Sequence, residues 1–222
     1  MPVQSVHVHA LSVALAVAMS APVAAQTCPT PAVATGGGEC TIPPGTVVTV
    51  PANAAGASAQ SAGSIIADGI TENLAGANAV GAYAQSGGRI SFNASTVQTT
   101  STAAAASGQI GLRASGAGSS ITSSGAIITM TPTGTSTPAN LRGVSAEAGA
   151  QIRLDNAQIQ VTGGSNALNN HAVVATGAGS TINLTSGSIS SNSRGAFGAA
   201  ALDGGLITLN GTTISTAGAQ NT

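Results

Sequence analysis

The chain has 222 residues, a formal net charge of -1 and only 5% charged residues, whereas an average soluble protein has about 25%. It contains five arginines and no lysine, so it has neither the basic patch of a nucleic-acid-binding protein nor the lysine of a phosphate-binding P-loop. Hydrophobic residues still make up 42% of the chain, which excludes a charged disordered protein and indicates a core of small and β-branched side chains.

The first 25 residues are typical of a secretory signal peptide. An apolar stretch extends roughly from Ala10 to Met19 and is too short to span a bilayer. Small residues follow it, and cleavage after Ala25 would place Val23 and Ala25 at the two small-residue positions of the cleavage site. We therefore predict that residues 1–25 direct export through the inner membrane and are removed.

Residues 26–59 contain both cysteines of the chain, Cys28 and Cys40. An even pair of cysteines in an exported protein predicts one structural disulfide, here closing a glycine-rich loop. The alternatives are a metal site or a reactive thiol, but no histidine or further cysteine lies nearby in the sequence. Residues 41–51 read as a turn and a strand. We predict that this segment forms an N-terminal cap over the structure that follows.

From residue 60 onward the sequence is an internal repeat of the form Gly-x-x-Ile-x-Leu. The leading apolar residues of five copies are spaced by 31, 31, 30 and 25 positions, and they are Ile90, Ile121, Ile152, Ile182 and Ile207. In every copy a second apolar residue lies seven positions after the first, at Val97, Ile128, Ile159, Ile189 and Ile214. A disordered low-complexity chain, which the Gly, Ala, Ser and Thr content would also suggest, does not keep such a fixed offset.

Each repeat unit predicts about three short strands separated by turns rich in Gly, Ser, Thr and Asn. In the strand at residues 152–154, Ile and Leu share one face and Arg points to the other. A unit of this size cannot bury its apolar face alone, whereas stacked units cover one another. We therefore predict an all-β parallel β-helix (β-solenoid) over residues 60–222, with the five leading isoleucines as a core ladder.

The repeat resembles the pertactin-like passenger domain of Gram-negative autotransporters (type V secretion). Residues 144–154 and 199–209 carry the resemblance best, and it covers roughly residues 40–222. It implies a right-handed β-helix carried to the cell surface by a C-terminal β-barrel in the outer membrane. The sequence has no run of barrel strands with aromatic girdles, so we expect the N-terminal part of a passenger without its translocator barrel.

The sequence predicts no catalytic, cofactor-binding or metal site. Outside the leader, His171 is the one histidine, and a catalytic triad would have to pair it with Asp155 or Asp203. No nucleophile motif accompanies it, so an ordinary turn histidine is the preferred interpretation. Among the six acids, Asp68 and Glu72 alone are close enough in sequence to suggest the paired carboxylates of a polysaccharide-cleaving enzyme.

The leading functional hypothesis is a non-enzymatic adhesin that binds a component of a host or neighbouring cell at the bacterial surface. A free secreted binding module, for glycans or for ice, is the alternative, and such a protein would be periplasmic or secreted. Ice binding requires an ordered threonine array, but the outward positions are mixed: Ser91, Thr122, Arg153, Asn183 and Thr208. A passenger enzyme acting on polysaccharide is the third hypothesis.

Overall fold

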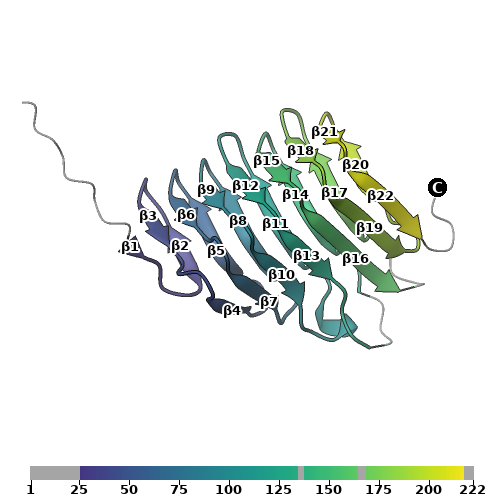
Figure 1. Ribbon diagram of the computed structural model, residues 1–222, viewed down its shortest axis with the longest axis horizontal. Helices are drawn as coiled ribbons and strands as arrows, with labels where there is room; N and C mark the ends of the chain where they lie inside the picture. Colours follow the sequence, from purple (N-terminus) through teal and green to yellow (C-terminus); the bar gives the residue numbers. More distant parts are fainter. Residues whose placement is uncertain (1–25, 135–137, 165–168, 218–222) are drawn as a thin grey trace, which may run out of the picture.

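The computed structural model describes residues 26–134, 138–164 and 169–217 (Figure 1). The chain forms an elongated right-handed parallel β-solenoid, which confirms the predicted fold class. Every strand pairing is parallel, and each turn contributes one strand to each of three sheets. Within the described residues, the one helical element is a short 3-10 helix, η1 (Ala103–Ala105). The predicted signal peptide, residues 1–25, lies outside the described residues.

The three walls of the solenoid are named sheets A, B and C, and a rung is one set of consecutive strands from B, A and C. Sheet A contains β1 (Gln26–Thr27), β3 (Glu39–Thr41), β6 (Ser64–Ile66), β9 (Arg89–Ser91), β12 (Ser120–Ser124), β15 (Gln151–Asp155), β18 (Thr181–Thr185) and β21 (Leu206–Asn210). Sheet B contains β2 (Ala32–Ala34), β5 (Ala55–Gln60), β8 (Val80–Gln85), β11 (Ile110–Ser115), β14 (Arg142–Glu147), β17 (His171–Thr176) and β20 (Ala199–Leu202). Sheet C contains β4 (Val47–Val50), β7 (Thr71–Leu74), β10 (Thr96–Thr99), β13 (Ile127–Met130), β16 (Gln158–Gly164), β19 (Ser188–Ser193) and β22 (Thr213–Ala217).

The leading isoleucines of the repeat form one continuous ladder on the inner side of sheet A. The register partners along this ladder are Cys40, Ile65, Ile90, Ile121, Ile152, Ile182 and Ile207. All except the last are buried. Burial of one such side chain stabilises the fold by about 1.5–3 kcal/mol, so the ladder is a major part of the core.

The second apolar residue of each copy faces the same interior from sheet C. This ladder contains Val48, Glu72, Val97, Ile128, Ile159, Ile189 and Ile214. It packs closely on sheet B, where a Cβ atom built on Gly143 would lie only 2.6 Å from Cγ2 of Ile159 and 2.6 Å from the Ala172 carbonyl oxygen. Glycine on β14 therefore makes room for the isoleucine of the facing sheet.

The first rung lies within residues 26–59, the segment predicted as an N-terminal cap. Strands β2, β3 and β4 of this segment pair in register with β5, β6 and β7 of the next rung. Cys28 and Cys40 form a disulfide with a Cα–Cα distance of 5.2 Å. Because Cys40 is also the first member of the isoleucine ladder, the disulfide lies directly at the N-terminal end of the core.

The opposite end of the solenoid exposes core positions. Strands β20, β21 and β22 form the last rung, and within the described residues no further rung packs on it. Leu209 is consequently 37% exposed and Ile214 45% exposed, although their ladder partners Leu184 and Ile189 are buried. The two ends of the described coil therefore differ, one bearing a covalent link and the other bare apolar side chains.

Candidate functional site

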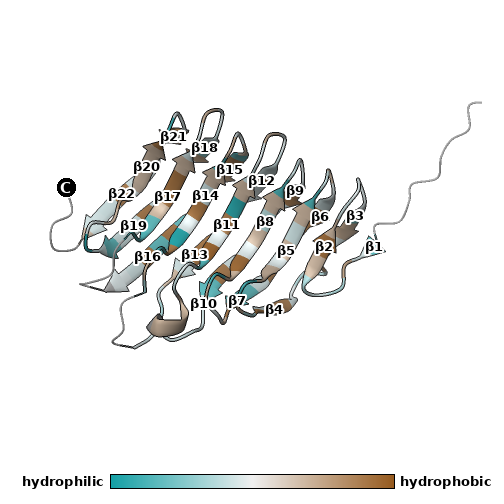
Figure 2. Ribbon diagram, turned by 180° about the vertical axis from the view of Figure 1, so that it is seen from behind, coloured by the Kyte–Doolittle hydropathy of each residue, from teal (hydrophilic) through white to brown (hydrophobic). Residues whose placement is uncertain are grey.

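The outer side of sheet B carries two ion pairs and a cation–π contact. We call this surface the sheet B face and define it by Tyr83, Arg113, Arg142, Glu147 and His171, which extend outward from β8, β11, β14 and β17. Hydrophilic stretches cross β11 and β14 in the view of Figure 2. By contrast, many outward positions on sheets A and C are the uncharged polar residues Ser, Thr, Asn and Gln.

An ionic network lies at the centre of the sheet B face. The Glu147 carboxylate accepts hydrogen bonds from Arg113 Nη2 at 2.7 Å and Nε at 3.2 Å, and its other oxygen accepts one from Arg142 Nη1 at 3.1 Å. Ser145 Oγ donates to the same carboxylate at 2.8 Å. The arginine side chains are about one third exposed, so we expect the network to contribute about 1 kcal/mol or less per pair to stability. Its stronger effect is to fix the positions of both guanidinium groups.

Arg113 also connects the ionic network to an aromatic ring. Arg113 and Tyr83 are register partners in β11 and β8, and the guanidinium carbon lies 5.0 Å from the centre of the Tyr83 ring. This geometry is that of a cation–π contact. The network thereby holds one face of the tyrosine ring in a fixed position.

His171 occupies the next rung of the same face. It is the register partner of Arg142, and its Nδ1 accepts a hydrogen bond from the Phe197 backbone N–H at 3.1 Å. The two rings also lie close together, with centroids 5.2 Å apart. Burial and the positive charge of Arg142 lower the pKa of His171, so the imidazole is neutral at neutral pH.

The structure does not assemble the triad that the sequence would require. Within the described residues, no hydrogen bond joins His171 to Asp155 or Asp203. Asp155 is exposed on sheet A, and Asp203 instead accepts a hydrogen bond from Thr176 Oγ1 at 3.3 Å.

The two acids that are close in sequence, Asp68 and Glu72, also have separate surroundings. Asp68 lies in the turn between β6 and β7, where its carboxylate accepts hydrogen bonds from Ser91 Oγ and from the backbone and side-chain nitrogens of Asn93. Glu72 points into the solenoid and is completely buried. The structure therefore does not bring them together as a pair of carboxylates around a shared substrate.

Glu72 is the most unusual titratable group in the core. Both carboxyl oxygens are buried without a hydrogen-bond partner. The side chain lies over Gly56 and Gly81, where added Cβ atoms would come within 2.5 Å and 2.6 Å of its oxygens. Removal from water disfavours the charged form and raises the pKa of Glu72 from 4.5 to about 8. At neutral pH the group is therefore mainly the neutral acid.

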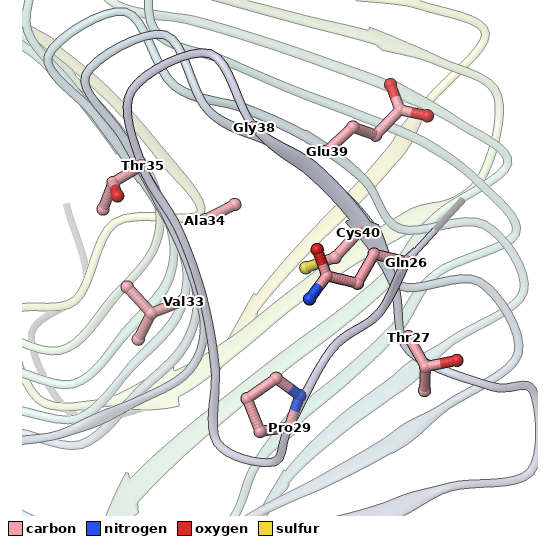
Figure 3. Close-up of a pocket in the computed structure, with 9 residues that line it drawn as sticks. All are labelled: Gln26, Thr27, Pro29, Val33, Ala34, Thr35, Gly38, Glu39 and Cys40. Carbon is pink, nitrogen blue, oxygen red and sulfur yellow. The ribbon is translucent and has the colours of Figure 1, made fainter. Parts of the chain in front are cut away.

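A cavity of about 230 Å³ opens at the N-terminal end of the coil. Figure 3 shows that Ala34 and Cys40 point into this first turn, whereas Val33 and Thr35 point away from it. Gln26 of β1 lies across the opening beside Cys40. The cavity is bounded by the disulfide loop and lies at the N-terminal end of the core. Glu39 is the one ionisable side chain in its lining, so the cavity holds no cluster of reacting groups.

Sequence reasoning identified the ladder residues and the cysteine pair but not the sheet B face. Tyr83, Arg113 and Glu147 are separated by roughly one repeat each, and nothing in a local motif connects them. The signal was available in the repeat itself, because aligning the units places Arg113 opposite Tyr83.

Within the described residues, no helix has both the length and the apolar character that crossing a membrane requires. Comparisons of the chain with protein-family models, with curated proteins and with solved structures found no match. The fold and the sheet B face are therefore the features from which a function can be inferred.

Proposed function

We propose that the chain is the N-terminal part of a pertactin-like autotransporter passenger, displayed at the bacterial surface and used for non-enzymatic adhesion. The observation that carries this proposal is the gathering of Tyr83, Arg113, Arg142, Glu147 and His171 on one outer face of a parallel β-solenoid. A solenoid offers long, regular surfaces to a partner, and conformationally fixed aromatic and arginine side chains are frequent binding determinants.

The expected partner is a component of a host or neighbouring cell surface. Two features support export as the route to it. The segment 1–25 has the pattern of a signal peptide, and the disulfide between Cys28 and Cys40 is typical of an oxidising compartment. We propose passage through the periplasm to the outer surface, with the barrel of the full-length protein as the translocator.

The test compares binding of the exported chain with binding of two matched variants to intact cells. Arg142→Ala removes a charge from the sheet B face, and Arg153→Ala removes an exposed charge from sheet A. We expect Arg142→Ala to weaken cell binding at least fivefold and Arg153→Ala to leave it unchanged. Equal binding by both variants and the unmodified chain would exclude the sheet B face as the adhesive surface.

A further inference from the structure

We propose that a depression at the N-terminal half of the sheet B face binds an uncharged glycan, with a pyranose ring stacked against Tyr83. This inference deepens the proposed adhesive function, because it assigns a ligand class to part of the same face. The depression has a volume of about 460 Å³. Its lining includes Val33, Asn53, Ser58, Asn78, Tyr83 and Arg113.

The depression follows the axis of the solenoid across four rungs. Val33, Ser58, Tyr83 and Arg113 are successive register partners from β2, β5, β8 and β11. With strands about 4.8 Å apart, these four positions span roughly 14 Å, which suits a short oligosaccharide lying along the ladder.

Tyr83 provides the stacking surface in this path. Arg113 covers one side of the ring at 5.0 Å from its centre, so the ring is held in place by the network around Glu147. At the same ladder position in the preceding rung the residue is Ser58, which is too small to pack against the other side of the ring. Tyr83 is half-buried and lines the depression together with Ser58. The weakly polar C–H face of a sugar ring is complementary to an aromatic face of this kind.

Polar groups beside the ring match the hydroxyl groups of a sugar. Asn53 and Asn78 form one rim, and Asn78 Nδ2 donates a hydrogen bond to Asn53 Oδ1 at 3.0 Å. Asn53 Nδ2 is a further amide donor on this rim. A few oriented polar groups around an apolar floor are the usual composition of a small-ligand site.

The charge balance favours a neutral ligand over an acidic one. Arg113 is the one charged residue in the lining, and its guanidinium already makes two hydrogen bonds to Glu147. A carboxylate, sulfate or phosphate on the ligand would have to compete with Glu147 for it. A neutral sugar can use the ring that Arg113 positions without disturbing the ion pair.

The chain offers a direct probe, because Tyr83 is its sole tyrosine and it has no tryptophan. Tyrosine fluorescence and isothermal titration calorimetry would be recorded with cellotetraose, maltotetraose and chitotetraose, with 3'-sialyllactose as the acidic sugar and decaproline as a peptide. We expect saturable binding of at least one neutral tetrasaccharide with a change in Tyr83 fluorescence. No binding of any neutral sugar at millimolar concentration, or stronger binding of sialyllactose or decaproline, would overturn the proposal.

Four variants locate the site by calorimetry. Tyr83→Ser places the residue of the preceding rung at this position and should weaken binding at least tenfold, whereas Tyr83→Phe keeps the ring and should stay within threefold. Asn53 has a φ of 58°, so Asn53→Gly removes the amide while tolerating that backbone, and we expect a loss of threefold or more. Arg153→Ala on sheet A should bind like the unmodified chain. Unchanged affinity in correctly folded Tyr83→Ser, checked by circular dichroism, would contradict the stacking role.

The experiments distinguish failure of the glycan site from failure of the proposed adhesive function. Loss of sugar binding in Tyr83→Ser together with unchanged attachment to cells would retain the glycan site and contradict its use in adhesion. Attachment to cells by a chain that binds none of the sugars would retain adhesion and overturn the glycan site.

Discussion

Glu72 and Val97 are register partners in neighbouring strands of sheet C, so a carboxyl side chain occupies a ladder that is otherwise filled with valine and isoleucine. No charged group faces Glu72 from the strands around it. β4, β5 and β10 have no titratable residue, and Tyr83 on β8 and Arg89 on β9 point outward. The carboxyl is consequently desolvated without compensation, which links the stability of the solenoid to pH.

We predict that the solenoid loses stability as the pH rises from 4.5 to about 8. The pKa of Glu72 in the folded state lies above its ordinary value, so its contribution is fully present below pH 4.5 and is lost as pH approaches the folded-state value. The slope should approach about 1.4 kcal/mol per pH unit within this window. Urea unfolding at pH 5.0, 6.5 and 8.0 measures it, and Glu72→Gln should flatten the curve.

His171 provides an internal comparison for the same experiment. Its pKa is lowered in the folded state, so its contribution has the opposite sign and is lost as pH falls below its ordinary value of 6.5. Between pH 6.5 and 8 the slope therefore reports mainly on Glu72. A chain whose stability is constant over this interval would contradict the buried neutral acid.

Replacing Glu72 by the residue of its ladder neighbours should stabilise the protein. Glu72→Val restores the side chain found at Val48 and Val97 and removes two buried oxygens that have no hydrogen-bond partner. Each such oxygen costs about 1–3 kcal/mol, so we expect a gain of at least 1 kcal/mol even at pH 4.5 and a larger gain at pH 8. Glu72→Gln, which keeps the polar atoms, serves as the matched control. Destabilisation by the valine variant at pH 8 would disprove this account.

Truncation of a ladder residue should lower the free energy of unfolding far more than truncation of its outward neighbour. Ile152 is buried between Ile121 and Ile182, whereas Arg153 is exposed on sheet A. Ile152→Ala should lower the free energy of unfolding by about 2–5 kcal/mol, and Arg153→Ala should change it by about 0.5 kcal/mol or less. Chemical denaturation of both variants measures the difference, and equal losses would refute the assigned register.

Reduction of the disulfide should weaken the N-terminal rung. The bond between Cys28 and Cys40 closes a loop with a sequence separation of 12, which corresponds to about 2–3 kcal/mol of loop entropy. Thermal unfolding with and without dithiothreitol should show this loss. The Cys28→Ser, Cys40→Ser double variant should be destabilised by a similar amount and should not respond to the reductant.

The sequence predicted the regular part of the solenoid because the ladder positions repeat with a constant seven-residue offset. Ile65 and residue 72 follow the same offset, but the residue there is Glu72, and no local rule predicts a carboxyl inside an apolar ladder. In the first rung the corresponding residues, Cys40 and Val48, are eight positions apart, and the Pro-Pro pair of the intervening turn interrupts the pattern. The repeat is thus harder to recognise in residues 26–59.

The candidate site was harder to predict for a different reason. Arg113 and Glu147 are 34 residues apart and meet diagonally across β11 and β14. Their contact depends on strand register and on which side of each strand faces water, and these follow only from stacking the units. A scan for short catalytic or metal-binding motifs therefore passes over the sheet B face.

The Cys28–Cys40 disulfide links the first rung within itself, and its effect on the rest of the solenoid depends on how the rungs contact one another. Each rung contacts mainly its two neighbours, so opening at one end need not disturb the other. Reduction of the disulfide should therefore speed deuterium exchange of the backbone amides in β2, β3 and β4 and leave exchange in β14, β15 and β16 unchanged. A single covalent bond would then protect one rung of the solenoid while the other rungs keep their own local stability.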